Sequence, residues 1–206
     1  QTPLGLGLAF ATKYHREVMK GSDRKRVALC YLGDGALNQG AFHEALNLAA
    51  LPSISAPVIY VVENNGYSMG TAIDRGTTMA HDLSKKAAAY GIEYLECDGH
   101  NILDLYDAFK PFVDVIRDEQ RPGFVNLHTY RYQGHSMSDP QKYRTKEEVE
   151  GVKKKDSIDQ LALYCMNERK SLSEEQFIAM QREVKEAVAR AIKFAEESPI
   201  PDISEL

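Results

Sequence analysis

Two short polar motifs, Gly33-Asp34-Gly35 and Asn64-Asn65-Gly66, contain the residue types best suited to bind a metal ion and a phosphate. Asp34 offers carboxylate oxygens and Asn65 an amide oxygen, and magnesium prefers oxygen ligands of this kind together with phosphate groups. The glycines let the backbone turn tightly and approach a bulky anion. The motifs therefore indicate a magnesium-diphosphate site, whereas a Gly-Asp-Gly motif alone is more often only a tight turn after a strand.

Each motif follows an apolar run with the composition of a buried strand. Residues 27–32 and 58–62 are rich in branched and aromatic side chains and stop at glycine or asparagine. Between them, residues 39–50 carry apolar side chains at helical spacing. A strand, helix and second strand joined by a right-handed crossover place both motifs at the same carboxyl edge of a parallel sheet.

The rest of the chain predicts further helices and strands around this unit. Asn101 is expected to cap one helix, and Ser173 opens a capping-box sequence at the start of another. We expect helices over 3–20, 83–90, 101–116 and 173–194, strands over 94–97 and 123–130, and an exposed loop over 135–143. This pattern predicts an α/β domain over 1–145, a parallel sheet with helices on both faces, and a helical region over 146–206 packed on the same domain.

Composition excludes several classes of function. The chain has 206 residues, of which 43% are apolar and 27% charged, as in ordinary globular proteins. Its formal net charge of −5 argues against nonspecific nucleic-acid binding, no apolar run approaches the ~20 residues of a membrane helix, and no export signal is visible. Cys30, Cys97 and Cys165 lack the spacings of zinc or redox motifs, so we expect reduced packing residues and a reducing compartment.

Three blocks of the sequence carry a resemblance to a known family. Two of them contain the candidate ligands Asp34 and Asn65, which are 31 positions apart. Residues 33–40, 63–71 and 130–140 resemble, in order, segments of the alpha subunit of the pyruvate dehydrogenase thiamine-diphosphate component, in the 2-oxo acid dehydrogenase family. The similarity runs from about Pro3 to the acidic tail. It implies an N-terminally truncated chain, because in that family the first helix follows a long segment that supplies further cofactor contacts.

The resemblance implies a role for several individual residues. Asp34, Asn65 and the backbone carbonyl of Tyr67 would bind the metal, with Asn64 holding the turn. His135 would be catalytic, lying over the cofactor and helping to transfer the acyl group; the alternative is an exposed loop histidine without a role. The residues expected to bind the cofactor are Gly33, Asp34, Gly35, Ala36, Asn65, Tyr67, Met69, Arg131 and His135.

Two of these loop positions keep alternatives open. Arg131 would order the loop or contact phosphate, and the alternative is a structural ion pair. Ser136 matches a position that kinases phosphorylate in regulated members of the family, where added negative charge beside an anionic cofactor would inhibit. Only Gln141 and Lys142 stand where those members carry a second regulatory serine, which argues against kinase control.

The activity implied by the resemblance is decarboxylation of pyruvate with thiamine diphosphate and Mg²⁺, followed by reductive acetylation of the lipoyl group of the acetyltransferase component. A beta subunit would supply the acid of the site, as part of an α2β2 tetramer. We expect a cytoplasmic bacterial protein, or a mitochondrial or plastid one in a eukaryote. The alternatives are a branched-chain 2-oxo acid dehydrogenase alpha subunit and a non-catalytic subunit without cofactor; Asp139-Pro140 favours the pyruvate form.

Overall fold

Four parallel strands form the central sheet of the structure, a computed structural model that describes residues 1–205. The strands are β1 (Ala28–Gly33), β2 (Val58–Asn64), β5 (Glu93–Asp98) and β6 (Gly123–His128). Their spatial order is β1-β2-β6-β5, so the last strand along the chain lies inside the sheet. β2 is almost continuously buried, which explains its unbroken apolar sequence.

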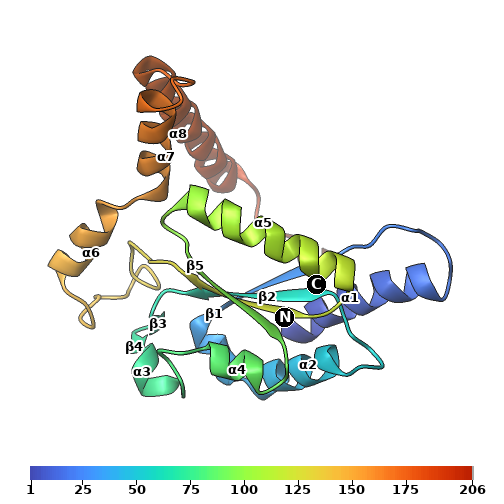
Figure 1. Ribbon diagram of the computed structural model, residues 1–206. Helices are drawn as coiled ribbons and strands as arrows, with labels where there is room; N and C mark the ends of the chain where they lie inside the picture. The colour runs from blue at the N-terminus through green and yellow to red at the C-terminus, as the bar shows by residue number, and fades with distance from the viewer. Residues whose placement is uncertain (206) are drawn as a thin grey trace. The chain divides into compact units, whose positions relative to one another are not determined.

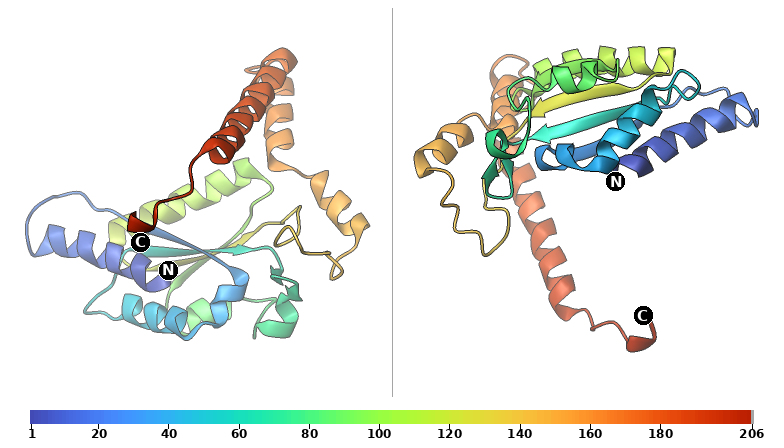
Figure 2. Two further views of the ribbon diagram at one scale, coloured as in Figure 1. Left: turned by 180° about the vertical axis from the view of Figure 1, so that it is seen from behind. Right: turned by 90° about the horizontal axis from the view of Figure 1, so that it is seen from below.

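Helices cover both faces of this sheet, as Figure 1 shows. On one face lie α1 (Thr2–Glu17), α2 (Gly40–Ala50) and α4 (Ser84–Ala88), and on the other lies α5 (Ile102–Glu119). The right-hand view of Figure 2 shows α1 and α2 on the same side of the sheet. The predicted α/β class, a parallel sheet with helices on both faces, is therefore confirmed.

Two apolar clusters hold these layers together. On the side of α2, the Phe42 ring makes edge contacts with Tyr60 and Phe124, with ring centroids 5.8 and 6.1 Å apart. On the side of α5, Ile116 packs with branched side chains of β2 and β6. Burying a side chain of this size stabilises the fold by about 1.5–3 kcal/mol.

The chemistry of single residues fixes several helix ends. The Asn101 side chain accepts a hydrogen bond from the Asp104 backbone N–H and caps α5. Ser173 and Gln176 form the reciprocal capping box of α8 (Glu174–Glu197). Both caps were predicted from the sequence and are confirmed. α1 ends at Glu17, earlier than predicted, and Lys20 then takes a positive φ of 55° as the chain turns away.

Short elements crowd the carboxyl edge of the sheet. The 3-10 helix η1 (Asp34–Asn38) follows β1 directly. After β2 come a hairpin of β3 (Tyr67–Ser68) and β4 (Thr71–Ala72), and then the short helix α3 (Ile73–Gly76). The glycine- and threonine-rich stretch expected as a site loop is therefore a small hairpin with a helical turn.

The chain divides into two compact units, the first over Gln1–Ser157 and the second beginning at Ile158. The first unit includes α6 (Lys146–Lys153). The second contains nearly all of α7 (Ser157–Asn167), then α8 and the 3-10 helix η2 (Ile203–Glu205). The expected boundary after residue 145, and the expected packing of the helical region on the first domain, stay predictions.

The three cysteines are free thiols, as expected. Cys30 in β1 and Cys97 in β5 are buried, and burial raises the pKa of both thiols above the usual value. They pack as small apolar side chains. Within residues 1–205, no helix combines the length and apolar character that crossing a bilayer requires.

Candidate functional site

The two polar motifs leave the sheet side by side. β1 and β2 are parallel neighbours, and Gly33 is in register with Glu63, so both strands end at the same edge. Asp34 opens η1 at the end of β1, and Asn64 ends β2. The predicted meeting of the motifs at one carboxyl edge is confirmed.

Asp34 is a buried carboxylate with one oxygen lacking a partner. Its side chain is only 2% exposed. Oδ1 accepts a hydrogen bond of 2.8 Å from the Gly35 backbone N–H, while Oδ2 is buried and has no hydrogen-bond partner. Leaving such an oxygen unsatisfied costs free energy, about 1–3 kcal/mol or more for a charged group. A bound cation would satisfy it.

The surroundings of Asp34 act on its pKa in two directions. Burial is the largest effect and raises the pKa of Asp34 above its ordinary value. The Gly35 N–H that donates to Oδ1 partly offsets this by lowering the pKa, as do the nearby N–H groups of Gly66 and Tyr67 and the positive charge of Arg131. The carboxylate therefore lies among the amides of the second motif, with too little compensation for its charge.

The second motif is a tight turn held by its own asparagines. Asn64 Oδ1 accepts a hydrogen bond from Gly66 N–H at 3.2 Å, and Asn65 Oδ1 accepts one from Tyr67 N–H at 3.0 Å. Gly66 has a φ of +80°, a left-handed conformation that favours glycine. A carbonyl oxygen has two lone pairs, so the Asn65 oxygen keeps the capacity for a second partner.

A small pocket of about 140 Å³ lies beside Asp34. Gly35 and Ser68 line it, and a Cβ added to Gly35 would lie 2.2 Å from Ser68 Oγ and 2.7 Å from Ser68 Cβ, so any larger residue would require Ser68 to move. Ala36 packs its methyl group against the apolar core, while the side of Gly33 is open. The pocket has room for several water-sized groups.

Arg131 connects this edge to the loop that follows β6. Its Nη2 donates hydrogen bonds to the Met69 carbonyl at 2.7 Å and to the Tyr143 hydroxyl at 3.0 Å. Its Nη1 lies 3.5 Å from His135 Nδ1. Arg131 Nε is buried without a hydrogen-bond partner. The buried Nε–H of Arg131 could donate to an anion, and the buried Oδ2 of Asp34 could bind a cation.

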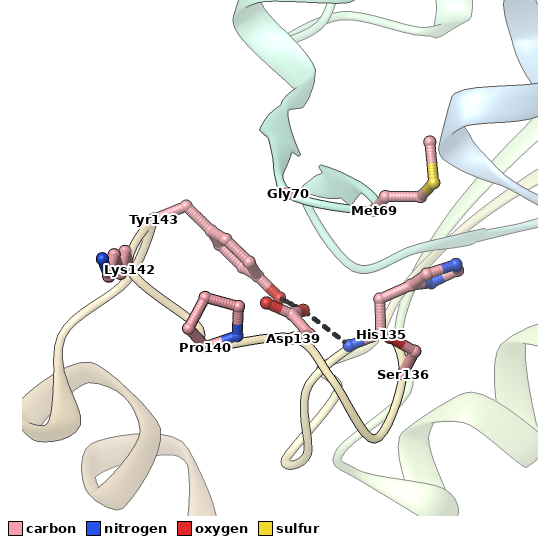
Figure 3. Close-up of a pocket in the computed structure, with 8 residues that line it drawn as sticks. All are labelled: Met69, Gly70, His135, Ser136, Asp139, Pro140, Lys142 and Tyr143. Carbon is pink, nitrogen blue, oxygen red and sulfur yellow. Dashed lines mark hydrogen bonds between the residues drawn. The ribbon is translucent and has the colours of Figure 1, made fainter.

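His135 lines an open pocket of about 500 Å³ together with Met69 and Ser136, drawn in Figure 3. The Asp139 carboxylate in Figure 3 accepts hydrogen bonds from the His135 backbone N–H at 2.8 Å and the Tyr143 hydroxyl at 2.7 Å. These bonds, led by the one from Tyr143, lower the pKa of Asp139 to about 2. The loop over 135–143 is exposed, as predicted, but Asp139 gives it internal order.

Arg144 and Glu148 complete the support of this loop, and no sequence pattern predicted a role for either. Arg144 donates to the backbone carbonyls of residues 131–133, and its guanidinium carbon lies 5.3 Å from the centre of the Tyr130 ring. Glu148 of α6 accepts hydrogen bonds from the hydroxyls of Tyr130 and Tyr67 at 2.7 and 3.3 Å. The Tyr67 side chain therefore faces α6.

The donor set suits a metal only together with a ligand that brings its own oxygens. Among the described residues, no three His, Cys, Asp or Glu side chains gather as a metal site. The predicted ligands are one carboxylate, one amide and one backbone carbonyl. A set of this kind is not a group of three His, Cys, Asp or Glu side chains. Magnesium commonly takes one or two protein ligands and completes its shell with phosphate oxygens and water.

Comparison with known proteins places this site in a family. The dehydrogenase E1 component family matches residues 1–204. Pyruvate dehydrogenase E1 component subunit alpha from Rickettsia conorii is 43% identical over 206 residues, which is 100% of this chain and 60% of the relative. The proteins of the same name from Rhizobium meliloti and Porphyra purpurea are 40% and 35% identical, over 100% and 99% of this chain and 56% and 58% of theirs.

The chain spans about three fifths of the length of these curated relatives. The family match covers nearly all of it, including both polar motifs and the loop after β6. The chain belongs to the dehydrogenase E1 component family.

Proposed function

We propose that this chain forms the metal and diphosphate side of a thiamine-diphosphate site and acts as the alpha subunit of a pyruvate dehydrogenase E1 component. The names of its relatives support the activity. The observation that carries the proposal is the buried Asp34 Oδ2, which has no hydrogen-bond partner. It stands next to a turn whose asparagines supply further oxygens.

The residues of the first motif and the turn hold the metal and the diphosphate. Asp34 and Asn65 contribute side-chain oxygens to Mg²⁺, and Tyr67 contributes its backbone carbonyl. Gly33, Gly35 and Ala36 would hold the diphosphate through backbone groups. Thiamine diphosphate, when bound, supplies the carbanion chemistry of decarboxylation, and the protein supplies orientation and field.

The loop after β6 provides the groups that act over the cofactor. Arg131 carries an unsatisfied N–H that suits a phosphate oxygen, and it fixes the Met69 carbonyl. His135 is exposed in the open pocket, where its imidazole is placed to act as an acid or a base on a bound group. Ser136 lies beside it, and its role as a regulatory phosphorylation site stays a prediction.

Partners complete the site in this proposal. A beta subunit provides the acid of the site and the other wall of the cofactor channel, in an α2β2 assembly. The acetyl group then passes to the lipoyl group of the acetyltransferase component. The isolated chain is accordingly inactive, and activity requires both subunits, Mg²⁺ and thiamine diphosphate.

The test is a comparison of Asp34→Ala with Asp74→Ala in the full alpha chain assembled with its beta subunit. Asp34→Ala should weaken Mg²⁺ binding in the presence of thiamine diphosphate by about 100-fold or more, because even outer-shell changes cost 10–100-fold. Asp74 is more than half exposed and interacts with His81, so its removal should leave the affinity unchanged. Isothermal titration measures both; equal affinities would contradict the metal assignment.

Substrate choice requires a separate measurement. The names of the relatives favour pyruvate over branched-chain 2-oxo acids. The assembled enzyme should decarboxylate pyruvate with a much higher kcat/KM than 3-methyl-2-oxobutanoate. The reverse order would support the branched-chain alternative, while tight cofactor binding without either reaction would support a non-catalytic subunit.

A further inference from the structure

A chain of side-chain hydrogen bonds leads from the second motif into the sheet. Asn64 Nδ2 donates to Asn126 Oδ1 at 3.1 Å, and both side chains are buried. Asn126 Nδ2 in turn lies 3.4 Å from Glu96 Oε1. Three parallel strands, β2, β6 and β5, each contribute one member. None of these bonds was predicted from the sequence.

Asn126 is an unusual residue for its position. It is 3% exposed in the middle of the sheet, between Val125 and Leu127, and Phe124 on the same face of the strand is fully buried. An unpaired amide there would cost about 1–3 kcal/mol, so the side chain must have partners on both sides. It finds them in Asn64 and Glu96.

The Glu96 carboxylate sets the direction of the whole chain of bonds. An ionised carboxylate only accepts hydrogen bonds, so the NH₂ group of Asn126 must face Glu96. The Asn126 oxygen therefore faces Asn64 and accepts from its NH₂ group. This leaves Asn64 Oδ1 directed at the Gly66 backbone N–H, 3.2 Å away.

Two neighbours hold Glu96 in place at the outer end. His128 Nε2 lies 2.6 Å from Glu96 Oε1, and the Tyr94 hydroxyl donates to Oε2 at 3.0 Å. The bond from His128 is the largest cause of the lowered pKa of Glu96, which stays ionised. Because His128 Nε2 donates to Glu96, its 3.4 Å approach to Asn126 Nδ2 joins two donors and is not a hydrogen bond.

We propose that Asn126 is a positioning residue for the metal turn, acting through Asn64. By orienting the Asn64 amide, it fixes the Gly66 N–H and so the direction in which Asn65 and Tyr67 face Asp34. The inference rests on the proposed function, in which Asn65 and Tyr67 bind Mg²⁺. It adds a residue from a strand that contributes no ligand of its own.

The first experiment replaces Asn126 by a side chain of similar size without hydrogen bonds. In the full alpha chain assembled with the beta subunit, Asn126→Leu should speed amide hydrogen exchange in residues 64–69 without cofactor. It should also weaken Mg²⁺ binding with thiamine diphosphate by about 10–100-fold. Val125→Ala is the matched control: Val125 is the preceding residue, fully buried on the opposite face, and loss of its side chain should lower Tm without either effect.

A conservative pair tests the bonds themselves and remains informative if Asn126→Leu does not fold. Asn126→Asp keeps the oxygen that accepts from Asn64 but places a second carboxylate against Glu96. Amide exchange in residues 64–69 should therefore become faster and the Mg²⁺ affinity should fall. Adding Glu96→Gln supplies an NH₂ donor to the new carboxylate and should restore both. Wild-type exchange in Asn126→Leu, or no restoration by Glu96→Gln, would overturn the proposal.

The two proposals fail in different ways. If Asp34→Ala leaves Mg²⁺ affinity unchanged, the metal assignment is wrong. The exchange measurement uses no metal and still reports whether Asn126 holds the turn.

Discussion

The turn over Asn64–Tyr67 and the loop over Arg131–Arg144 reach the same edge of the molecule, but different interactions hold them. The turn is fixed by buried amides that continue into the sheet. The loop is fixed largely by exposed or half-buried hydrogen bonds, such as those of Asp139 and the Arg144 guanidinium. One region is an extension of the core, and the other is a surface structure.

This difference indicates how each region responds to change. The Asn64–Asn126 hydrogen bond behind the turn is buried and meets no competing water, so we expect the turn to keep its geometry with or without a ligand. Exposed hydrogen bonds stabilise less, because water competes for the same donors and acceptors. We therefore expect the turn to determine binding and the loop to determine turnover.

The largest expected effect is on catalysis by His135. His135→Ala should lower kcat of the assembled enzyme by about 10²–10⁴-fold, the usual contribution of a general acid or base. The affinity for Mg²⁺ should stay unchanged, because the side chain lies in the loop. Steady-state kinetics with pyruvate and titration of Mg²⁺ on the same preparation separate the two quantities.

The control for this variant is Lys142→Ala, in the same open pocket. Removing this nearby positive charge should change kcat little. If His135→Ala matched this control, His135 would be an exposed histidine without a role. A loss of Mg²⁺ affinity equal to the loss in kcat would abolish the contrast between turn and loop.

A smaller effect is expected when the loop loses its clamp. Arg144→Ala removes the hydrogen bonds to the carbonyls of residues 131–133. The loop should become disordered, and kcat should fall by about 10–100-fold, because small displacements of catalytic groups are costly. Amide exchange should rise in residues 131–144 and stay unchanged in residues 64–69. Exchange that rose equally in both segments would contradict separate support.

Much of the turn could be predicted from the sequence because its causes are local. Apolar runs such as residues 58–62 predict buried strands, and a crossover between parallel strands fixes which ends meet. Because Asp34 and Asn65 directly follow these strand ends, their location at the same edge of the sheet could be predicted. The caps at Asn101 and Ser173 were equally readable, since each depends on residues three positions apart.

The support behind the site depends on contacts that no local pattern encodes. Asn126 meets Asn64 because β6 inserts beside β2, and the sequence did not predict that strand order. Glu148 reaches Tyr67 across 81 positions. In the sequence, Arg144 resembles any charged surface residue. In the fold, its guanidinium donates to three backbone carbonyls. Sequence patterns therefore did not predict these long-range polar contacts.

The smallest effect concerns acid, and it has opposite signs in the two regions. The pKa of Asp139 is lowered to about 2, below the ordinary 3.8, so its ionised form stabilises the loop above about pH 4. That stabilisation is lost as the pH falls through about 2. The pKa of Asp34 is raised, so protonation relieves a penalty at the turn as the pH falls.

Acid should therefore loosen the loop before the turn. Between pH 4 and 2, exchange corrected for its intrinsic pH dependence should rise a few-fold in residues 133–144 and by less in residues 64–69, where the relief from protonating Asp34 opposes the loss of the Glu96 carboxylate. Asp139→Asn removes the titrating group, so its loop should exchange faster already at pH 7 and show no further step in acid. The Asp139 carboxylate accepts hydrogen bonds from both the Tyr143 hydroxyl and the His135 backbone N–H. If exchange in Asp139→Asn still rose by the same factor between pH 4 and 2, another group would control the order of the loop.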